Sequence, residues 1–541
     1  MTKETRYIEL FSNPGMVALE AIPVLNYPDF IAFLDLVMGE EGTHCVAYFV
    51  VPKGDTYRFV CCMAADENHA LVLFSHEQPI KPTPSLPSIT VKHFQFHVFE
   101  REIHEQFGIE FEGHPWLKPI RYPFDRADQH SVMNNYPFYS IEGEGLHEVG
   151  VGPIHAGIIE PGHFRFICHG ERVLHLEIHL GYQHRGMEKL FVEKQHILAQ
   201  SLLAESMAGD TTVGHALAYA GAVEALAGIR VSQQRSMERI VALELERIAV
   251  HIGDTAALCT DIAYQFGQVV NEALRTIIIN TTQIWCGNRF GKGLIRPGGT
   301  NYPLTQEVMA TILKNLEEVE ERYNQVTDRI FSLPSVLSRF EETGRVTTMQ
   351  ATLIGAVGMA ARSSGMYRDI RWSHPFSGYV DHFYDPAMLH KGDVWARAML
   401  RKLEVGKSME VIREMIVEMT NDQLPMTNDQ LPVTNDQLPM TNDQLPMTND
   451  QLPMTNEKSE KPVYNLKLQP SSLSISLVEG WRGEICHIAV TDESGKIIHY
   501  KAKDPSLHNW MALALAVRNQ EISDFPLCNK SFNLSYCGND L

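Results

Sequence analysis

Eight histidines lie close together between His147 and His196, and their density raises the question of a metal site. In the pattern His175-x-Glu177-x-His179, both imidazoles would share one face of a strand, because side chains alternate along it. Zinc sites, however, recur as Cys and His ligands in paired spacings, and neither a His-Glu-x-x-His helix nor a cysteine pair accompanies these residues. We therefore expect surface or hydrogen-bonded histidines rather than a protein-bound zinc.

A glycine-flanked loop at residues 150–157 reads Gly-Val-Gly-Pro-Ile-His-Ala-Gly. Glycine lets a backbone approach a ligand closely, and the imidazole of His155 can donate a hydrogen bond to a carbonyl group. The loop does not match the Gly-x-Gly-x-x-Gly fingerprint of a dinucleotide site, so no NAD site is indicated. A structural turn and a ligand-binding loop both stay open.

Glu244 lies within the apolar stripe of a predicted helix, where a carboxylate must form an ion pair or take up a proton. Two interpretations follow from this position. In the first, Glu244 forms a structural pair with a nearby arginine such as Arg247 or Arg239. In the second, it handles protons at a functional site.

The nine cysteines are scattered along the chain, and none belongs to a Cys-x-x-Cys pair. Such spacing argues against a disulfide framework, a zinc ribbon and a four-cysteine iron–sulfur cluster within this chain. The cysteines stand at positions 45, 61, 62, 168, 259, 286, 486, 528 and 537.

The elements that must position these residues belong to a chain of 541 residues, which suggests three or four domains at roughly 150 residues each. Its 44% apolar and 21% charged residues are typical of folded globular proteins. The net charge of −20 argues against general nucleic-acid binding, which depends on neutralising phosphates. No run of about 18 apolar residues predicts a membrane span, and the N-terminal residues lack the apolar core of a signal peptide. We therefore expect a cytoplasmic protein.

A seven-residue unit, Met-Thr-Asn-Asp-Gln-Leu-Pro, repeats five times from Met419 to Pro453, with one Val for Met, and a truncated copy follows to Asn456. A period of seven is also that of a coiled coil. Each unit contains a proline, however, which removes a backbone donor and clashes with the preceding helical turn. The repeat is therefore interpreted as a low-complexity insertion.

The remaining chain predicts an α+β fold. Residues 1–130 mix short apolar runs with turn residues, which indicates an α/β module, and the polar residues 131–146 follow as a connector. Residues about 190–420 are mostly helical in pattern, and Leu473–Ile498 returns to β character.

Two local signals are sharper than the rest. Ser232 is predicted to cap a helix whose apolar residues recur at helical spacing. Within the β-like residues 147–185, Val173–Leu180 alternates strictly, which places Leu176 and its apolar neighbours on one face and Glu177 with its flanking histidines on the other.

Five motifs, taken in order, resemble the D subunit of respiratory complex I and equally the large subunit of energy-converting (group 4) NiFe hydrogenases. These motifs are Gly152-Pro153-Ile154-His155, His184-Arg185-Gly186-Met187-Glu188-Lys189-Leu190, Glu244-Leu245-Glu246-Arg247-Ile248, Arg296-Pro297-Gly298-Gly299 and Arg362-Ser363-Ser364-Gly365. An earlier stretch, from Glu100 to Pro115, resembles the end of the C subunit of complex I, its 30-kDa subunit. This order is similar to that of formate hydrogenlyase-type large subunits. It implies a C-like module at 1–130 and a D-like domain at 147–418 and 457–541, interrupted by the repeat at 419–456.

The resemblance also identifies where those hydrogenases bind their metals, through two pairs of cysteines whose soft thiolates suit nickel and iron. The four ligand positions match Ala208, Thr211, Ser535 and Gly538, and Cys537 is one place out of register. We therefore expect no NiFe centre and no cofactor bound by this chain itself.

In the D subunit of complex I, the loop histidine helps to bind the quinone head group and an aspartate stands behind it. The matching residues are His155 and Asp261, but the family's quinone-binding tyrosine is not matched, because Gly209 lies near that position. An aspartate behind a histidine raises the pKa of the imidazole, which suits proton delivery to a reduced quinone. The resemblance thus implies possible quinone binding at His155, with Asp261, Glu244 and His215 lining the cavity or a proton path.

The preferred hypothesis is an oxidoreductase subunit at the cytoplasmic face of the membrane, in a complex I-like or hydrogenase-related assembly. A partner subunit with a 4Fe-4S cluster would supply electrons, and membrane-arm subunits would move ions. The alternative is a non-catalytic scaffold of such a complex. A polar, connected cavity favours chemistry, and an apolar, collapsed one favours the scaffold.

Overall fold

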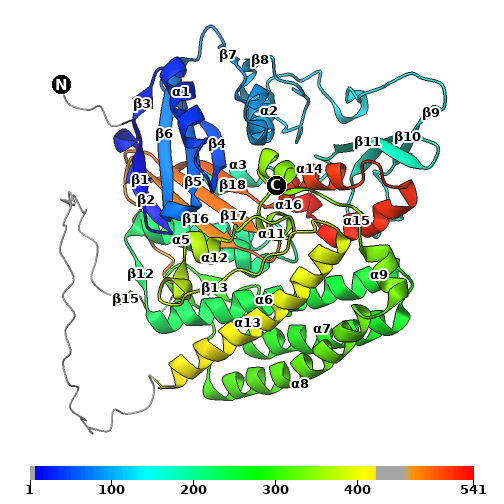
Figure 1. Ribbon diagram of the computed structural model, residues 1–541. Helices are drawn as coiled ribbons and strands as arrows, with labels where there is room; N and C mark the ends of the chain where they lie inside the picture. Colours follow the sequence, from blue (N-terminus) through cyan, green and yellow to red (C-terminus); the bar gives the residue numbers. More distant parts are fainter. Residues whose placement is uncertain (1–5, 422–457, 460–461) are drawn as a thin grey trace, which may run out of the picture.

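The computed structural model describes residues 6–421, 458–459 and 462–541 (Figure 1). The predicted repeat therefore lies outside the described residues, apart from its first three. The described chain combines helices with small sheets, as the α+β prediction required. No described helix is long and apolar enough to cross a membrane.

The N-terminal sheet has the order β1-β6-β5-β4, and β3 pairs with β6 in parallel. Its strands are β1 (Ile8–Leu10), β3 (Val24–Leu25), β4 (Thr43–Lys53), β5 (Thr56–Ala65) and β6 (Ala70–Pro79). Helices α1 (Tyr27–Val37) and α2 (His97–Phe107) pack against this sheet around Phe30, Tyr48 and Phe74. Alternate residues such as Phe49 and Leu73 join the main core instead, so the sheet is buried on both faces.

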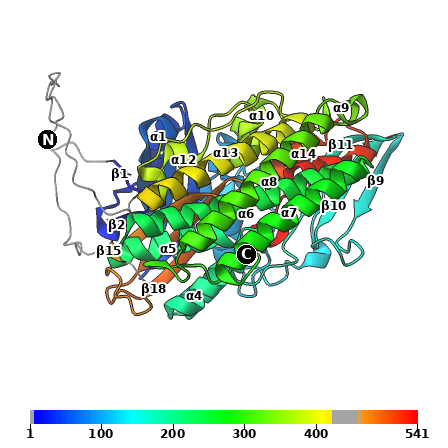
Figure 2. The same ribbon diagram turned by 90° about the horizontal axis from the view of Figure 1, so that it is seen from below.

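Long helices form the body of the molecule (Figures 1 and 2). They are α5 (Thr212–Ala227), α6 (Gln233–Asp261), α7 (Gln265–Cys286), α8 (Gln306–Ile330) and α13 (Val394–Asn421). The predicted cap is confirmed, because the Ser232 hydroxyl accepts the backbone N–H of Arg235, and the predicted stripe from Met237 to Ile252 is buried.

One boundary differs from the prediction. Helix α13 continues through Asn421, so the repeat begins inside a helix, and Met419 is buried in the main core. The first residue of the low-complexity sequence therefore belongs to the helical core.

The β character predicted after the repeat is confirmed by a four-stranded antiparallel sheet in the order β18-β17-β16-β2. Its strands are β16 (Ser472–Glu479), β17 (Glu484–Thr491), β18 (Ile497–Lys503) and the N-terminal β2 (Gly15–Ala18). Three buried ion pairs connect the first 105 residues to later parts of the chain. They are His44–Glu484 at 2.7 Å, Asp66–Arg368 at 3.4 Å and Glu102–Lys501 at 2.5 Å.

A third sheet, β11-β10-β9, is antiparallel and consists of β9 (Leu146–Val151), β10 (His163–His169) and β11 (Arg172–His179). The alternating pattern of β11 correctly predicts a strand, but not which side chains are buried. Glu177 and His179 are each 2% exposed, whereas Leu174 is 37% exposed. The cause is the preceding segment, which covers the polar face: Lys118 donates to Glu177 at 2.5 Å, and the backbone N–H of Tyr139 donates to it at 2.7 Å.

Shorter elements complete the chain. The helices are α3 (Met187–Glu193), α4 (Ile197–Ala204), α9 (Pro334–Phe340), α10 (Thr348–Leu353), α11 (Gly358–Arg362), α12 (Ile370–Ser373), α14 (Ser506–Ala516), α15 (Phe525–Phe532) and α16 (Tyr536–Asp540). The strands are β7 (Ser85–Pro87), β8 (Glu110–Glu112), β12 (Arg230–Val231), β13 (Ile295–Arg296), β14 (Gly299–Thr300) and β15 (Lys458–Ser459).

Candidate functional site

Glu244 is fully buried on α6, where its carboxylate pairs with Arg247 at 2.9 Å. It also accepts hydrogen bonds from the hydroxyl groups of Tyr379 and Ser408 at 2.7 and 2.6 Å. Burial favours the neutral acid, but the charges of Arg247 and Arg371 outweigh it and hold the pKa of Glu244 below its ordinary value. Of the two interpretations of Glu244, the geometry supports the structural ion pair.

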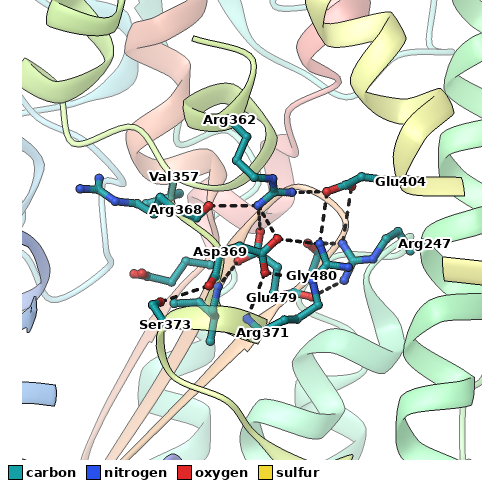
Figure 3. A network of polar contacts seen from close by, with 12 residues as sticks. Arg247, Val357, Arg362, Arg368, Asp369, Arg371, Ser373, Glu404, Glu479 and Gly480 are labelled. Atoms are coloured by element: carbon teal, nitrogen blue, oxygen red, sulfur yellow. Dashed lines mark hydrogen bonds and ion pairs between the residues drawn. The ribbon is translucent and has the colours of Figure 1, made fainter. Parts of the chain in front are cut away.

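That pair belongs to a buried network drawn from distant segments (Figure 3). The network joins the carboxylates of Glu244, Asp369, Glu404 and Glu479 to the guanidinium groups of Arg247, Arg362 and Arg371. Four potential negative charges thus face three positive ones. His251 adds a hydrogen bond to Glu404 at 2.7 Å, but burial lowers the pKa of this imidazole despite Glu404.

The surplus carboxylate of this network is Glu479. Among the described residues, only Arg362 pairs with it, at 2.6 Å, whereas Asp369 contacts two arginines and Glu404 contacts three. Burial and the neighbouring charge of Asp369 raise the pKa of Glu479 to about 7, against the attraction of Arg362. Glu404 is the opposite case, because Arg362, His251 and Arg371 together overcome burial and hold its pKa well below the ordinary value.

The structure does not bring His155 and Asp261 together. His155 lies in the β9–β10 connection, where its Nε2 donates to the carbonyl oxygen of Gly162 at 2.8 Å. Asp261 is the last residue of α6, and its exposed side chain makes no hydrogen bond or ion pair with the described residues. The tip of the His155 loop exposes two apolar side chains, Ile154 at 82% and Ile158 at 86%.

The two segments that match the metal-binding pairs do converge. Arg482 connects them, because its guanidinium donates to Thr211 Oγ1 at 3.1 Å and to the carbonyl oxygen of Asn533 at 2.5 Å. It also forms a bidentate pair with Asp210, with both N–O distances at 2.7 Å. Arg185 makes a second connection, to the carbonyl oxygens of Met207 and Cys537.

The residues at this place do not fit a NiFe centre. The Ser535 hydroxyl is engaged by the backbone N–H of Gly538 at 2.9 Å, and Ala208 offers no donor atom. At Gly538, a Cβ atom would stand 2.6 Å from the carboxylate carbon of Asp504, so a cysteine has no room there. Burial raises the pKa of the nearby Cys537 thiol to about 11, which keeps it a protonated and poor ligand.

His215 lies in a line of four buried polar groups that begins beside this place. Its Nε2 lies 3.1 Å from Asp504 Oδ2, and its Nδ1 lies 3.0 Å from Nε2 of His487. Nδ1 of His487 in turn lies 2.6 Å from the hydroxyl of Tyr500. We call Asp504, His215, His487 and Tyr500 the relay.

The electrostatics of the relay favour a neutral His487 and a charged Asp504. Burial, together with His215, holds the pKa of His487 well below its ordinary value, so this imidazole is neutral. Burial favours the neutral form of Asp504, but the hydrogen bond from His215 and the charge of Arg482 hold the pKa of Asp504 below its ordinary value. In the form with a neutral His215, Tyr500 donates to His487, His487 to His215 and His215 to Asp504, which gives every donor an acceptor.

The far end of the relay, Tyr500, is 1% exposed and lies beside a cleft. Tyr500 lines an open cleft of about 770 Å³ that His184, Arg185 and the C-terminal Leu541 also line. Of the four relay residues, the sequence motifs single out only His215, because the other three lie some 270 to 290 residues away. Strand pairing was the missing signal, since His487 and Tyr500 project from the same face of neighbouring strands.

A further proton-holding group stands next to the converged segments. Glu246 is half-buried, and its carboxylate accepts the backbone N–H groups of Val213 and Gly214, at the N-terminus of α5. Burial raises the pKa of Glu246 to about 8, although these N–H groups oppose the rise. A carboxylic acid that is neutral near pH 7 can give or take a proton within the physiological range.

Two family models match successive parts of this chain. The family model of the respiratory-chain NADH dehydrogenase 49 Kd subunit matches residues 262–540, slightly more than half of the chain, and that of the 30 Kd subunit matches residues 26–139. Formate hydrogenlyase subunit 5 of Escherichia coli is 24% identical over 84% of this chain and 77% of its own length. The membrane-bound hydrogenase subunit alpha of Pyrococcus furiosus is 25% identical over 70% and 83%.

A solved structure shows the same fold. A chain of an archaeal respiratory membrane complex, the membrane-bound sulfane sulfur reductase, superposes with a TM-score of 0.62 at 19% identity. The superposition covers 74% of the present chain and 100% of that chain.

Proposed function

Since the chain belongs to the family of the respiratory-chain NADH dehydrogenase 49 Kd subunit, we propose that it serves as a peripheral subunit of a membrane-associated oxidoreductase complex. Electrons would arrive from a 4Fe-4S cluster in a partner subunit rather than from a NiFe centre. Membrane-arm subunits would couple the transfer to ion movement, at the cytoplasmic face. The acceptor would bind near the converged segments, and a quinone is the first candidate.

The main support for this proposal is that other side chains occupy the positions that match the metal ligands of the hydrogenases. The Arg482–Asp210 pair and the Asp504 carboxylate fill the place where a hydrogenase of this family would need four thiolates. The polar groups that remain are suited to proton transfer, because the relay begins beside this place with Asp504 and Glu246 lies next to it. A redox step that consumes protons would draw on such groups.

The loop around His155 supports a partner subunit. Ile154 and Ile158 are almost fully exposed at its tip, and exposed apolar side chains of this size mark contact sites when they cluster. His155 itself would contact an acceptor only if its hydrogen bond to Gly162 opened. Direct quinone binding by His155, with Asp261 behind it, stays a prediction.

Metal analysis of the complex isolated with its partner subunits tests this proposal. We expect iron and acid-labile sulfide, with no nickel bound to this chain. Nickel at one per complex, bound by this chain, would overturn the proposal. The variant Gly538→Cys serves as a matched control, and we expect it to bind no nickel, since Asp504 occupies the space that the new side chain needs.

The scaffold hypothesis is the second candidate, and the buried ion-pair network favours it, because such networks also serve structure alone. Tyr500→Phe separates the two candidates, since it removes the entry donor of the relay at nearly constant volume. If this subunit delivers protons, the variant slows turnover of the complex with an artificial electron acceptor and increases its solvent isotope effect. Unchanged turnover and isotope effect would favour the scaffold.

A further inference from the structure

A small cavity of about 60 Å³ lies between α2, β11 and α14, away from the relay. Its walls are mainly apolar, with Leu176, Leu180 and Trp510 among them. Three polar side chains face it, namely those of His97, Arg101 and Asn539. A volume of this size accommodates a few water molecules or one carboxylate group.

His97 has unfilled hydrogen-bonding capacity in this cavity. Its side chain is 3% exposed, and neither ring nitrogen has a hydrogen-bond partner among the described residues. The imidazole stacks between Phe94, at 4.6 Å, and Trp116, at 5.9 Å between ring centroids. A buried donor and acceptor without partners destabilise the folded protein, so this imidazole is suited to hydrogen-bond a bound molecule.

Arg101 is a buried cation without a counter-charge. It is 7% exposed, and its Nε and Nη2 donate to the carbonyl oxygens of Lys118 and Pro119, both at 2.8 Å. Its guanidinium lies 4.6 Å from the centre of the Trp116 ring. No carboxylate of the described chain forms an ion pair with it, although a buried charge ordinarily requires one.

A larger cavity of about 370 Å³ adjoins the small one, since Trp116, Leu176, Met511 and Ala514 line both. Its walls are mostly apolar and include Phe94, Pro115, Leu353, Ile354 and Leu515. This volume lies in the range of small-molecule sites. Met511, a flexible side chain, and Ala514, a small one, belong to the wall that the two cavities share, so a slender chain has little to displace in its passage between them.

The charge of the two cavities differs in sign from that of the whole chain. Arg101, Lys118 and Arg518 line them, against the single carboxylate of Glu177, which Lys118 already pairs at 2.5 Å. The chain as a whole carries −20. An excess of positive charge in an acidic protein favours an anionic ligand.

We propose that these two cavities form a binding site for a small amphipathic carboxylate. Its acid group occupies the small cavity and accepts hydrogen bonds from Arg101 and His97, while its apolar chain lies in the large cavity against Leu353 and Met511. Binding would pair the buried guanidinium and satisfy one imidazole nitrogen at the same time. The site is independent of the electron-transfer function proposed above.

Isothermal titration calorimetry of the purified full-length chain tests this assignment with three probes. Decanoate carries both an acid and a chain, decanol carries the chain alone, and propionate carries the acid with almost no chain. We expect one decanoate per protein, with decanol and propionate binding at least tenfold more weakly. No decanoate binding up to its solubility limit, or equal binding of decanoate and decanol, would overturn the proposal; the cavities would then hold water or any apolar molecule.

Two variants locate the binding. Arg101→Gln removes the cation, and Ala514→Leu narrows the passage without touching a charge, so the second variant serves if the first does not fold. We expect each to weaken decanoate binding at least tenfold. Arg322→Gln is the control, because this arginine forms an exposed pair with Glu318 elsewhere, and its affinity should equal that of the wild type. Wild-type affinity in a folded Arg101→Gln or Ala514→Leu variant would refute the site.

Discussion

The charge count of the buried network leads to a prediction that two isosteric substitutions should have opposite effects. Glu479→Gln removes the surplus carboxylate, and Glu404→Gln removes the carboxylate that contacts three arginines and His251. Both replacements keep the volume of the side chain, so packing changes little. Any difference between them reports the electrostatics of the network.

The magnitude for Glu479 follows from its two protonation equilibria. Its pKa is about 7 in the folded protein and near 4.5 when unfolded, so the folded state retains a proton that the unfolded state has released. The contribution of Glu479 to the free energy of unfolding is therefore fully present below pH 4.5 and is lost as the pH rises through 7. At about 1.4 kcal/mol per pH unit, the loss between pH 5.5 and pH 8.5 is about 2 kcal/mol.

Urea unfolding of both variants and the wild type at several pH values measures these effects. Between pH 5.5 and pH 8.5, the free energy of unfolding of the wild type should fall by about 2 kcal/mol more than that of Glu479→Gln. Glu404→Gln should lose about 3–5 kcal/mol at pH 8.5, because three buried arginines lose one of their carboxylate contacts and His251 loses its charged acceptor. If both variants lose equal stability at pH 8.5, or if the gap between Glu479→Gln and the wild type does not change with pH, the assignment of the surplus charge is wrong.

Three further predictions concern other parts of the chain. Ser232→Ala should lower the free energy of unfolding by about 1 kcal/mol, as measured in urea, because the first turn of α6 loses the acceptor for the Arg235 N–H. Deleting residues 426–453, four of the five repeat units, should leave the thermal midpoint unchanged in calorimetry, since it spares Met419 and the end of α13; a large fall would show that the deleted units contribute to stability. His487→Phe should change the nitrogen chemical shifts of His215 by NMR, because His215 loses the donor to its Nδ1; unaltered shifts would contradict the direction assigned to the relay.

Local signals in the sequence predicted local structure well. The Ser232 cap and the buried stripe behind it needed only the spacing of residues within one helix. The strand at Val173–His179 needed only alternation. Neither signal could show that Glu177 is buried, because the segment that covers it lies some 40 to 60 residues earlier.

The candidate site was predictable only in part, for the same physical reason. His215 and Glu244 were found because a motif or a helix face singled them out, but their partners come from segments far along the chain. Asp504 and His487 meet His215 through the packing of α5 against the C-terminal sheet. Glu404 and Glu479 likewise reach the network of Glu244 from distant segments, and no local spacing in the sequence predicts either contact.

The pairing of β2 with β16 has a consequence for how this chain can be made and divided. A strand formed by residues 15–18 is the edge partner of one formed by residues 472–479. During synthesis, the N-terminal segment must therefore wait for almost the entire chain before its strand has a neighbour. The buried pairs His44–Glu484 and Glu102–Lys501 impose the same delay on the adjoining sheet and on α2. The N-terminal segment is thus not a separable module, because the last quarter of the chain pairs with its strand and with its buried charges. Expressing the two parts as separate fragments would leave each with unpaired charges in an exposed core.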